Sequence, residues 1–114
     1  MATYEEMLAE ELQEGEEVLE QTAGDYWKYL LFFGSRERGR YFFTNKRIIF
    51  YYFGSKEFEI PYNDIVSAQL CMVGPLIRFV PCGINVTTGD DTKYHLSLMK
   101  RNHYLELISN KANL

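Results

Sequence analysis

The clearest structural signal in this sequence lies in residues 39–51, Gly39-Arg40-Tyr41-Phe42-Phe43-Thr44-Asn45-Lys46-Arg47-Ile48-Ile49-Phe50-Tyr51. Two runs of aromatic and β-branched residues flank a short polar centre, Thr44-Asn45-Lys46, which is typical of two antiparallel strands joined by a tight turn. Asn45 suits the turn because asparagine tolerates a left-handed backbone better than most residues do. The sequence therefore predicts a β-hairpin here, with the positive charges of Lys46 and Arg47 at its mouth.

Length and composition favour a single β-rich domain. A chain of 114 residues can bury one hydrophobic core without the help of a metal or a disulfide. Aromatic residues make up 16% of the chain, and its nine Tyr and eight Phe lie mostly in alternating runs, which favours strands. We expect one domain over residues 1–114.

The formal net charge of −4 hides a strong segregation of charge along the chain. Residues 1–25 carry acidic side chains and no Lys or Arg, whereas residues 26–56 are rich in Lys and Arg and contain Glu37 as their one acid. The acidic opening argues against nucleic-acid binding, which needs a domain with a basic surface. We expect no nucleic-acid partner.

The sequence also indicates where the protein works. Its first residues are acidic and do not resemble a signal peptide, and its longest apolar runs, 29–33 and 48–53, are far shorter than a membrane-spanning helix. Cys71 and Cys82 are then expected to be buried and reduced rather than bridged. We predict a cytoplasmic protein.

A helix is predicted at the start of the chain, over residues 3–14. Thr3-Tyr4-Glu5-Glu6 fits a capping box, in which the Thr3 hydroxyl accepts from the amide of Glu6. Apolar residues then follow at helical spacing, and Gly15 can end the helix in a left-handed conformation.

Residues 26–98 are expected to form about seven short strands at spacings typical of a barrel or sandwich. Before them, Ala23-Gly24-Asp25 is expected to break a transitional segment at residues 16–20. Residues 26–33 are predicted to form a strand that is apolar on both faces, and residues 34–39 a glycine-bounded polar loop.

A second helix is predicted over residues 100–111. Tyr104, Leu105 and Ile108 lie three and four positions apart, which places them on one apolar stripe. A helix with a single apolar stripe has the right shape to close the open end of a small barrel.

Four stretches of the chain resemble a bacterial pleckstrin-homology-like domain of the GRAM type. They are Leu12-x-x-Gly15-Glu16-x-Val18-Leu19, Gly39-x-Tyr41-x-x-Thr44-Asn45-Lys46-Arg47-Ile48-Ile49-Phe50, Ile60-Pro61-Tyr62-Asn63-Asp64-Ile65, and Val86-Thr87-Thr88-Gly89-x-x-x-Lys93-Tyr94. The Thr-Asn-Lys-Arg stretch is the most specific of these, and the resemblance extends from Leu12 to Ile108.

The resemblance implies a PH-like fold, namely a seven-stranded, strongly bent β-barrel capped by a C-terminal helix, here with an extra N-terminal helix. It also implies a non-enzymatic module that binds proteins or lipid surfaces, and some bacterial members self-assemble. The basic residues that would line the family's lipid pocket correspond here to Lys28, Arg36, Arg38 and Arg40.

Six basic residues are candidates for contact with an anion: Lys28, Arg36, Arg38, Arg40, Lys46 and Arg47. Arginine can hold a phosphate or carboxylate through a bidentate fork, and lysine acts as a point charge. For Lys46 and Arg47 the structural alternative is favoured, in which Arg47 packs against the barrel and pairs with an acid. For the three alternating arginines the alternative is a solvated loop.

Four aromatic residues are candidates for an interaction surface: Trp27, Phe33, Tyr51 and Phe53. They belong to segments that are apolar at both alternating registers, and a small barrel has only one interior. Some of these side chains are therefore expected to be exposed.

No set of residues points to catalysis, a metal or a cofactor. His95, His103, Cys71 and Cys82 match no metal-ligand spacing, and no serine or glycine-rich loop has the context of a nucleophile or a phosphate site. We expect no catalytic residue, no metal and no cofactor.

The functional expectation is a non-catalytic module that binds a protein, with a second copy of itself as one possible partner. The alternative is peripheral binding to anionic lipid at the inner face of the membrane, through the basic loop and hairpin. A small-molecule carrier that uses the barrel mouth is a third hypothesis, and the helix plug leaves it little room.

Overall fold

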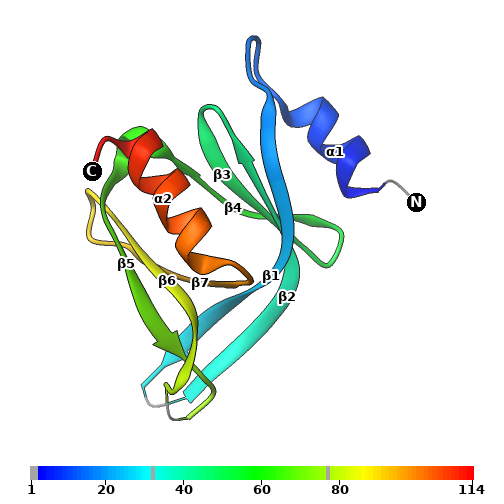
Figure 1. Cartoon of the computed structure of the whole chain (residues 1–114). Helices are drawn as coiled ribbons and strands as arrows, with labels where there is room; N and C mark the ends of the chain where they lie inside the picture. Colours follow the sequence, from blue (N-terminus) through cyan, green and yellow to red (C-terminus); the bar gives the residue numbers. More distant parts are fainter. Residues whose placement is uncertain (1–2, 32, 77) are drawn as a thin grey trace.

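The computed structural model describes residues 3–31, 33–76 and 78–114. Figure 1 shows the elements in chain order. They are α1 (Tyr4–Glu11), β1 (Val18–Leu30), β2 (Phe33–Thr44), β3 (Arg47–Tyr52), β4 (Ser55–Pro61), the short 3₁₀ helix η1 (Tyr62–Asp64), β5 (Ile65–Val73), β6 (Val80–Thr88), β7 (Lys93–Leu98) and α2 (Arg101–Ala112).

Within these ranges the strands form one seven-stranded antiparallel sheet, in the order β4-β3-β2-β1-β7-β6-β5. The predicted mainly β fold with a helix near each end is confirmed. The sheet is not closed into the predicted barrel. Its edge strands β4 and β5 are consecutive in the chain but do not pair with each other in the part described. Pro61 ends β4 without an amide donor, and η1 then turns the chain into β5.

The C-terminal helix closes the concave side of the sheet (Figure 1). Tyr104 and Ile108 are buried in the main core, and Leu105 packs against it. The Tyr104 ring stacks on Phe43 with ring centroids 4.8 Å apart. The predicted apolar stripe is therefore confirmed as the contact between α2 and the sheet.

The first two strands are longer than predicted. Their glycines were expected to end the strands, but each strand continues through them. β1 continues through Ala23-Gly24-Asp25, where a break was expected, and β2 includes residues 34–39, where a loop was expected. Gly24 pairs with Gly39 across the hairpin. A Cβ atom at Gly24 would lie 2.7 Å from the carbonyl oxygen of Ser97, and one at Gly39 would overlap the carbonyl oxygen of Tyr51. These glycines mark close backbone approach within a strand.

The N-terminal helix forms a second, smaller core on the other face of the sheet. Thr3 caps α1, and its side chain accepts from the Glu6 amide at 3.1 Å, as predicted. Leu8 packs on Phe42, Ile49 and Tyr51. Tyr51, one of the four aromatic candidates of which some were expected to be exposed, is buried: it is only 3% exposed, because α1 gives this part of the sheet two covered faces.

The close approach at Gly39 yields a stability prediction. Gly39→Ala is expected to lower the free energy of unfolding by about 2 kcal/mol or more, because the new methyl group collides with backbone rather than with a flexible side chain. Chemical denaturation measures this loss. Gly89→Ala is the matched control, since its Cβ would meet nothing closer than 3.9 Å. Equal stability of the two variants would contradict the close approach.

Candidate interaction site

The β2–β3 turn, at the centre of the family resemblance, holds the segment that leads from α1 into β1. Asn45 accepts from the Glu17 amide through Oδ1 at 3.0 Å, and its Nδ2 donates to the Gly15 carbonyl at 3.0 Å. The Lys46 ammonium donates to the carbonyl of Glu14 at 3.0 Å. Asn45 and Lys46 are thus engaged in contacts within the chain.

Arg47 lies at the centre of a buried ion-pair network and is 3% exposed. Its Nε and Nη2 donate to the two carboxylate oxygens of Glu16 at 2.9 and 3.0 Å. Its Nη1 also contacts the carboxylates of Glu11, at 3.3 Å, and Glu59. The guanidinium therefore joins α1, the segment that precedes β1, and β4, and it is not available to an external anion.

The network fixes the charge of Glu16. Burial alone would raise the pKa of this carboxyl, but hydrogen bonds from Arg47, from the Gln13 amide and from the Thr44 hydroxyl outweigh that effect and lower the pKa to about 2. The same carboxylates raise the pKa of Arg47. Glu16 thus stays ionised in the folded protein at any pH well above 2.

The other basic candidates are spread over several contacts rather than gathered into one patch. Lys28 lies 3.2 Å from Glu37 and 3.0 Å from Glu57, and its pKa is raised by the hydrogen bond to Glu57. Arg36 and Arg38 both face Asp25, at 3.8 and 3.2 Å. Arg40 donates to Gln21 at 3.3 Å. Most of the positive charge expected for an anion site is thus already balanced.

The ends of two hairpins meet to form an exposed apolar surface, which we call the apolar tip. The β1–β2 hairpin contributes Leu30, Leu31 and Phe33, and the connection from β5 to β6 contributes Leu76 and Phe79; these side chains are between 60% and 83% exposed. The Gly34 amide donates to the Pro75 carbonyl at 2.5 Å, and the Gly74 amide donates to the Tyr29 hydroxyl at 3.2 Å. In Figure 1 the two hairpin ends lie together, away from α1.

The four aromatic candidates fall into different places. Phe33 belongs to the apolar tip and is exposed, as expected. Trp27 is 7% exposed and is therefore not one of the exposed candidates. Phe53 is exposed in the β3–β4 turn with a left-handed backbone. It does not join the tip, because the register places Tyr51 beside Arg40, seven residues along β2 from Phe33 at its start.

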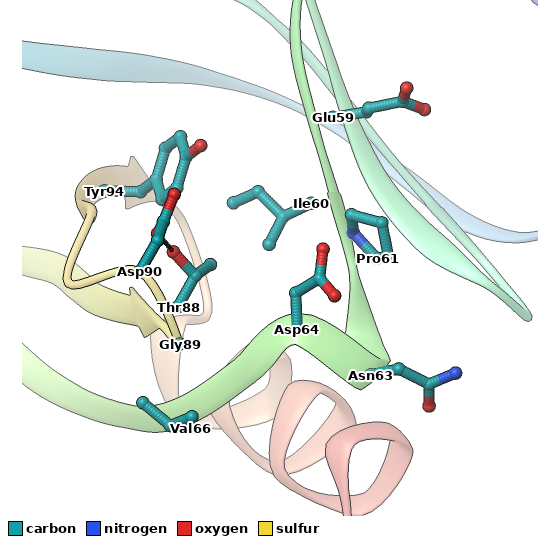
Figure 2. Close-up of a pocket in the computed structure, with 10 residues that line it drawn as sticks. All are labelled: Glu59, Ile60, Pro61, Asn63, Asp64, Val66, Thr88, Gly89, Asp90 and Tyr94. Atoms are coloured by element: carbon teal, nitrogen blue, oxygen red, sulfur yellow. Dashed lines mark hydrogen bonds between the residues drawn. The ribbon is translucent and has the colours of Figure 1, made fainter.

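A separate hollow of about 440 Å³ lies where the two sheet edges fail to pair. Figure 2 shows Ile60 and Asp64 pointing into it, with Asp90 and Tyr94 on the opposite side. Asp90 accepts from the Thr88 hydroxyl at 2.5 Å and from the Thr92 amide at 3.2 Å, and these bonds lower its pKa. The Thr88 and Thr92 contacts place Asp90 in the β6–β7 turn.

Two other features bear on function. In the part of the chain that the structure describes, no three His, Cys, Asp or Glu side chains are placed to hold a metal ion. None of the described helices is long and apolar enough to cross a membrane.

Comparison with known proteins gives a fold but no family. Neither a protein-family model nor a curated protein matches this sequence. Among solved structures, the chain is similar to the C-terminal domain of an unknown protein from Leishmania infantum, with a TM-score of 0.67 and 16% sequence identity. The match covers 89% of this chain and 88% of that chain. At this identity the likeness shows a shared fold alone.

Sequence reasoning missed most of the apolar tip. Residues 26–33 are apolar at both alternating registers. Since α1 covers only part of the sheet, this pattern indicated that some of these side chains are exposed. Leu76 and Phe79 follow Gly74-Pro75, a turn signal, so two apolar residues in a connection also pointed to exposure.

The buried network yields a second prediction. Arg47→Met should destabilise the protein by about 3–5 kcal/mol at neutral pH, because Glu16 is left buried without its counter-charge. Lys28→Met, which removes an exposed pair, is the control and should cost about 1 kcal/mol or less. Urea denaturation measures both.

The pH dependence follows from the lowered pKa of Glu16. In the wild type, its contribution to stability is complete above its usual pKa of 4.5 and is lost as the pH falls toward about 2. The gap between wild type and Arg47→Met should therefore shrink below pH 4.5. A gap that stays constant across this range would contradict the network.

Proposed function

We propose that this chain is a non-catalytic, PH-like interaction module that binds protein through its apolar tip, and that a second copy of the chain is a partner. The proposal combines the resemblance of the sequence to bacterial PH-like domains with the apolar surface at the end of the two hairpins. Both cysteines are free, which suits a cytoplasmic setting.

The observation that carries the proposal is the exposure of five large apolar side chains at the ends of two neighbouring hairpins. Burying a single Leu or Phe side chain is worth about 2 kcal/mol. A two-fold contact buries the same side chains from both copies at once, so it needs no separate groove on the partner. The tip is thus suited to pairing with itself.

The charges around the tip favour a protein over an anionic lipid. Lys28, Arg36 and Arg38 are each close to a carboxylate of the same chain, from Glu37, Glu57 or Asp25. Two copies can then approach without strong repulsion from these three side chains. Arg78, between Leu76 and Phe79, forms no ion pair among the described residues and is the positive charge left at the tip. The membrane alternative becomes an outcome of the test.

The test compares three surface variants. Light scattering across a concentration series should show reversible dimer formation by the wild type. Leu31→Glu and Phe33→Glu should each weaken dimerisation at least tenfold, because they place a charge in an apolar contact. Phe53→Glu, on an exposed aromatic outside the tip, is the control and should dimerise like the wild type.

Two results would overturn the proposal. One is a wild type that stays monomeric at every concentration. The other is a dimer that the tip variants leave intact. If the monomeric wild type instead binds vesicles that contain anionic lipid, and Leu31→Glu abolishes that binding, the tip is a membrane contact and the protein-binding proposal fails.

A further inference from the structure

A second set of unsatisfied groups lies on the outer face of the sheet, behind the tip. Trp27 of β1 pairs with His95 of β7, so their side chains share one face. Tyr29 stacks beside Trp27 with ring centroids 6.2 Å apart, and meets His95 edge-on at 5.0 Å. Arg78 covers the Tyr29 ring, with its Cζ 3.7 Å from the ring centroid.

This cluster has a donor without an acceptor. The indole N–H of Trp27 is buried and has no hydrogen-bond partner in the described part of the chain. A buried donor that is left unpaired costs about 1–3 kcal/mol, so such groups are rare in folded proteins unless something else accepts the bond. Trp27 itself lines a hollow of about 380 Å³ together with Tyr26, Lys28, Tyr29, Lys93 and His95. Of its two lysines, Lys28 is paired with Glu37 and Glu57.

The cluster also has positive charge without a counter-charge. Within the described residues, neither Lys93 nor Arg78 forms an ion pair, in contrast to Lys28, Arg36, Arg38 and Arg47. Burial, followed by the charges of Arg78 and Lys93, lowers the pKa of His95. The cations therefore repel a proton on His95, and in the described ranges no carboxylate balances them.

We infer that this outer-face hollow binds a small organic anion with a flat apolar part. An oxygen of the ligand accepts from the Trp27 indole, and Lys93, which lines the hollow, supplies the opposite charge. Arg78 does not line the hollow and adds positive charge from its place against the Tyr29 ring. The rings of Tyr29 and Trp27 give the flat part of the ligand an apolar surface.

The inference stands apart from the proposed self-association. Its residues lie on the outer face of β1 and β7, apart from Arg78, which stands between Leu76 and Phe79 in the β5–β6 connection. None of the five apolar side chains of the tip takes part in it. A protein that fails to dimerise could still bind the anion, and the tip variants leave this site unchanged. The two proposals can therefore fail separately.

Trp27 is the sole tryptophan, so its indole N–H gives a single resonance that reports directly on the site. We would titrate ¹⁵N-labelled protein with phenyl phosphate, benzoate and inorganic phosphate. Phenyl phosphate and benzoate should move the indole resonance saturably in the direction of a stronger hydrogen bond. Inorganic phosphate should bind at least tenfold more weakly, because it has no flat apolar part.

Variants separate the role of each group. Trp27→Phe keeps an aromatic ring but removes the donor, and should weaken phenyl phosphate binding, measured by calorimetry, about tenfold. Lys93→Gln should weaken it severalfold. Lys46→Gln removes a lysine at the β2–β3 turn, away from this face, and is the matched control that should bind like the wild type.

A titration with anionic vesicles tests whether the anion can be a lipid headgroup. Anionic vesicles that shift the indole resonance while the soluble anions also do so would indicate a lipid headgroup as one source of the same chemistry. An indole resonance that no soluble anion moves saturably would overturn the inference. Unchanged binding in both Trp27→Phe and Lys93→Gln would overturn it as well.

Discussion

The ion pair between Arg47 and Glu16 is the contact on which the arrangement of the N-terminal half depends. It buries two opposite charges that must satisfy each other, because either one alone would be costly in the interior. Through Glu11 and Glu59 the same guanidinium reaches α1 and β4. With α1 held in place, Leu8 covers Phe42 and Ile49, and the sheet gains a core on each face.

This internal use of charge also decides which surfaces remain for a partner. The basic residues that resemble an anion site are largely occupied by carboxylates and carbonyl groups of the chain itself. The surface groups without a partner of their own are different ones: the apolar side chains at the end of the two hairpins, and the indole and cations around His95. The candidate contact surface therefore lies at the end of the molecule opposite the charged β2–β3 turn.

Much of the fold could be predicted from sequence because it depends on local patterns. The hairpin around Asn45, the capping box at Thr3 and the apolar stripe of α2 each follow from residues close in the chain. The errors came from contacts between distant residues. Gly24 looked like a breaker, yet it serves the close approach of the Ser97 carbonyl, which no local pattern reveals. Tyr51 was kept as a candidate for exposure because the cover that α1 provides depends on tertiary packing.

The candidate site was harder to predict for the same reason. An arginine in a turn has the same local signature whether it binds a ligand or an internal carboxylate, and Glu16 lies far from Arg47 in sequence. The apolar tip requires two hairpin ends from different parts of the chain to meet, which the hydrogen bond between Gly34 and Pro75 records. Phe33 was identified as a candidate, whereas its neighbours Leu76 and Phe79 were not.

The most direct test of the central claim, that the apolar tip is the contact surface, is an intermolecular nuclear Overhauser experiment. Equal amounts of isotope-labelled and unlabelled chain are mixed at high concentration. We expect nuclear Overhauser effects between the two copies that involve Leu31, Phe33 and Phe79. Cross-copy contacts confined to other surfaces, or none at the highest concentration reached, would contradict it.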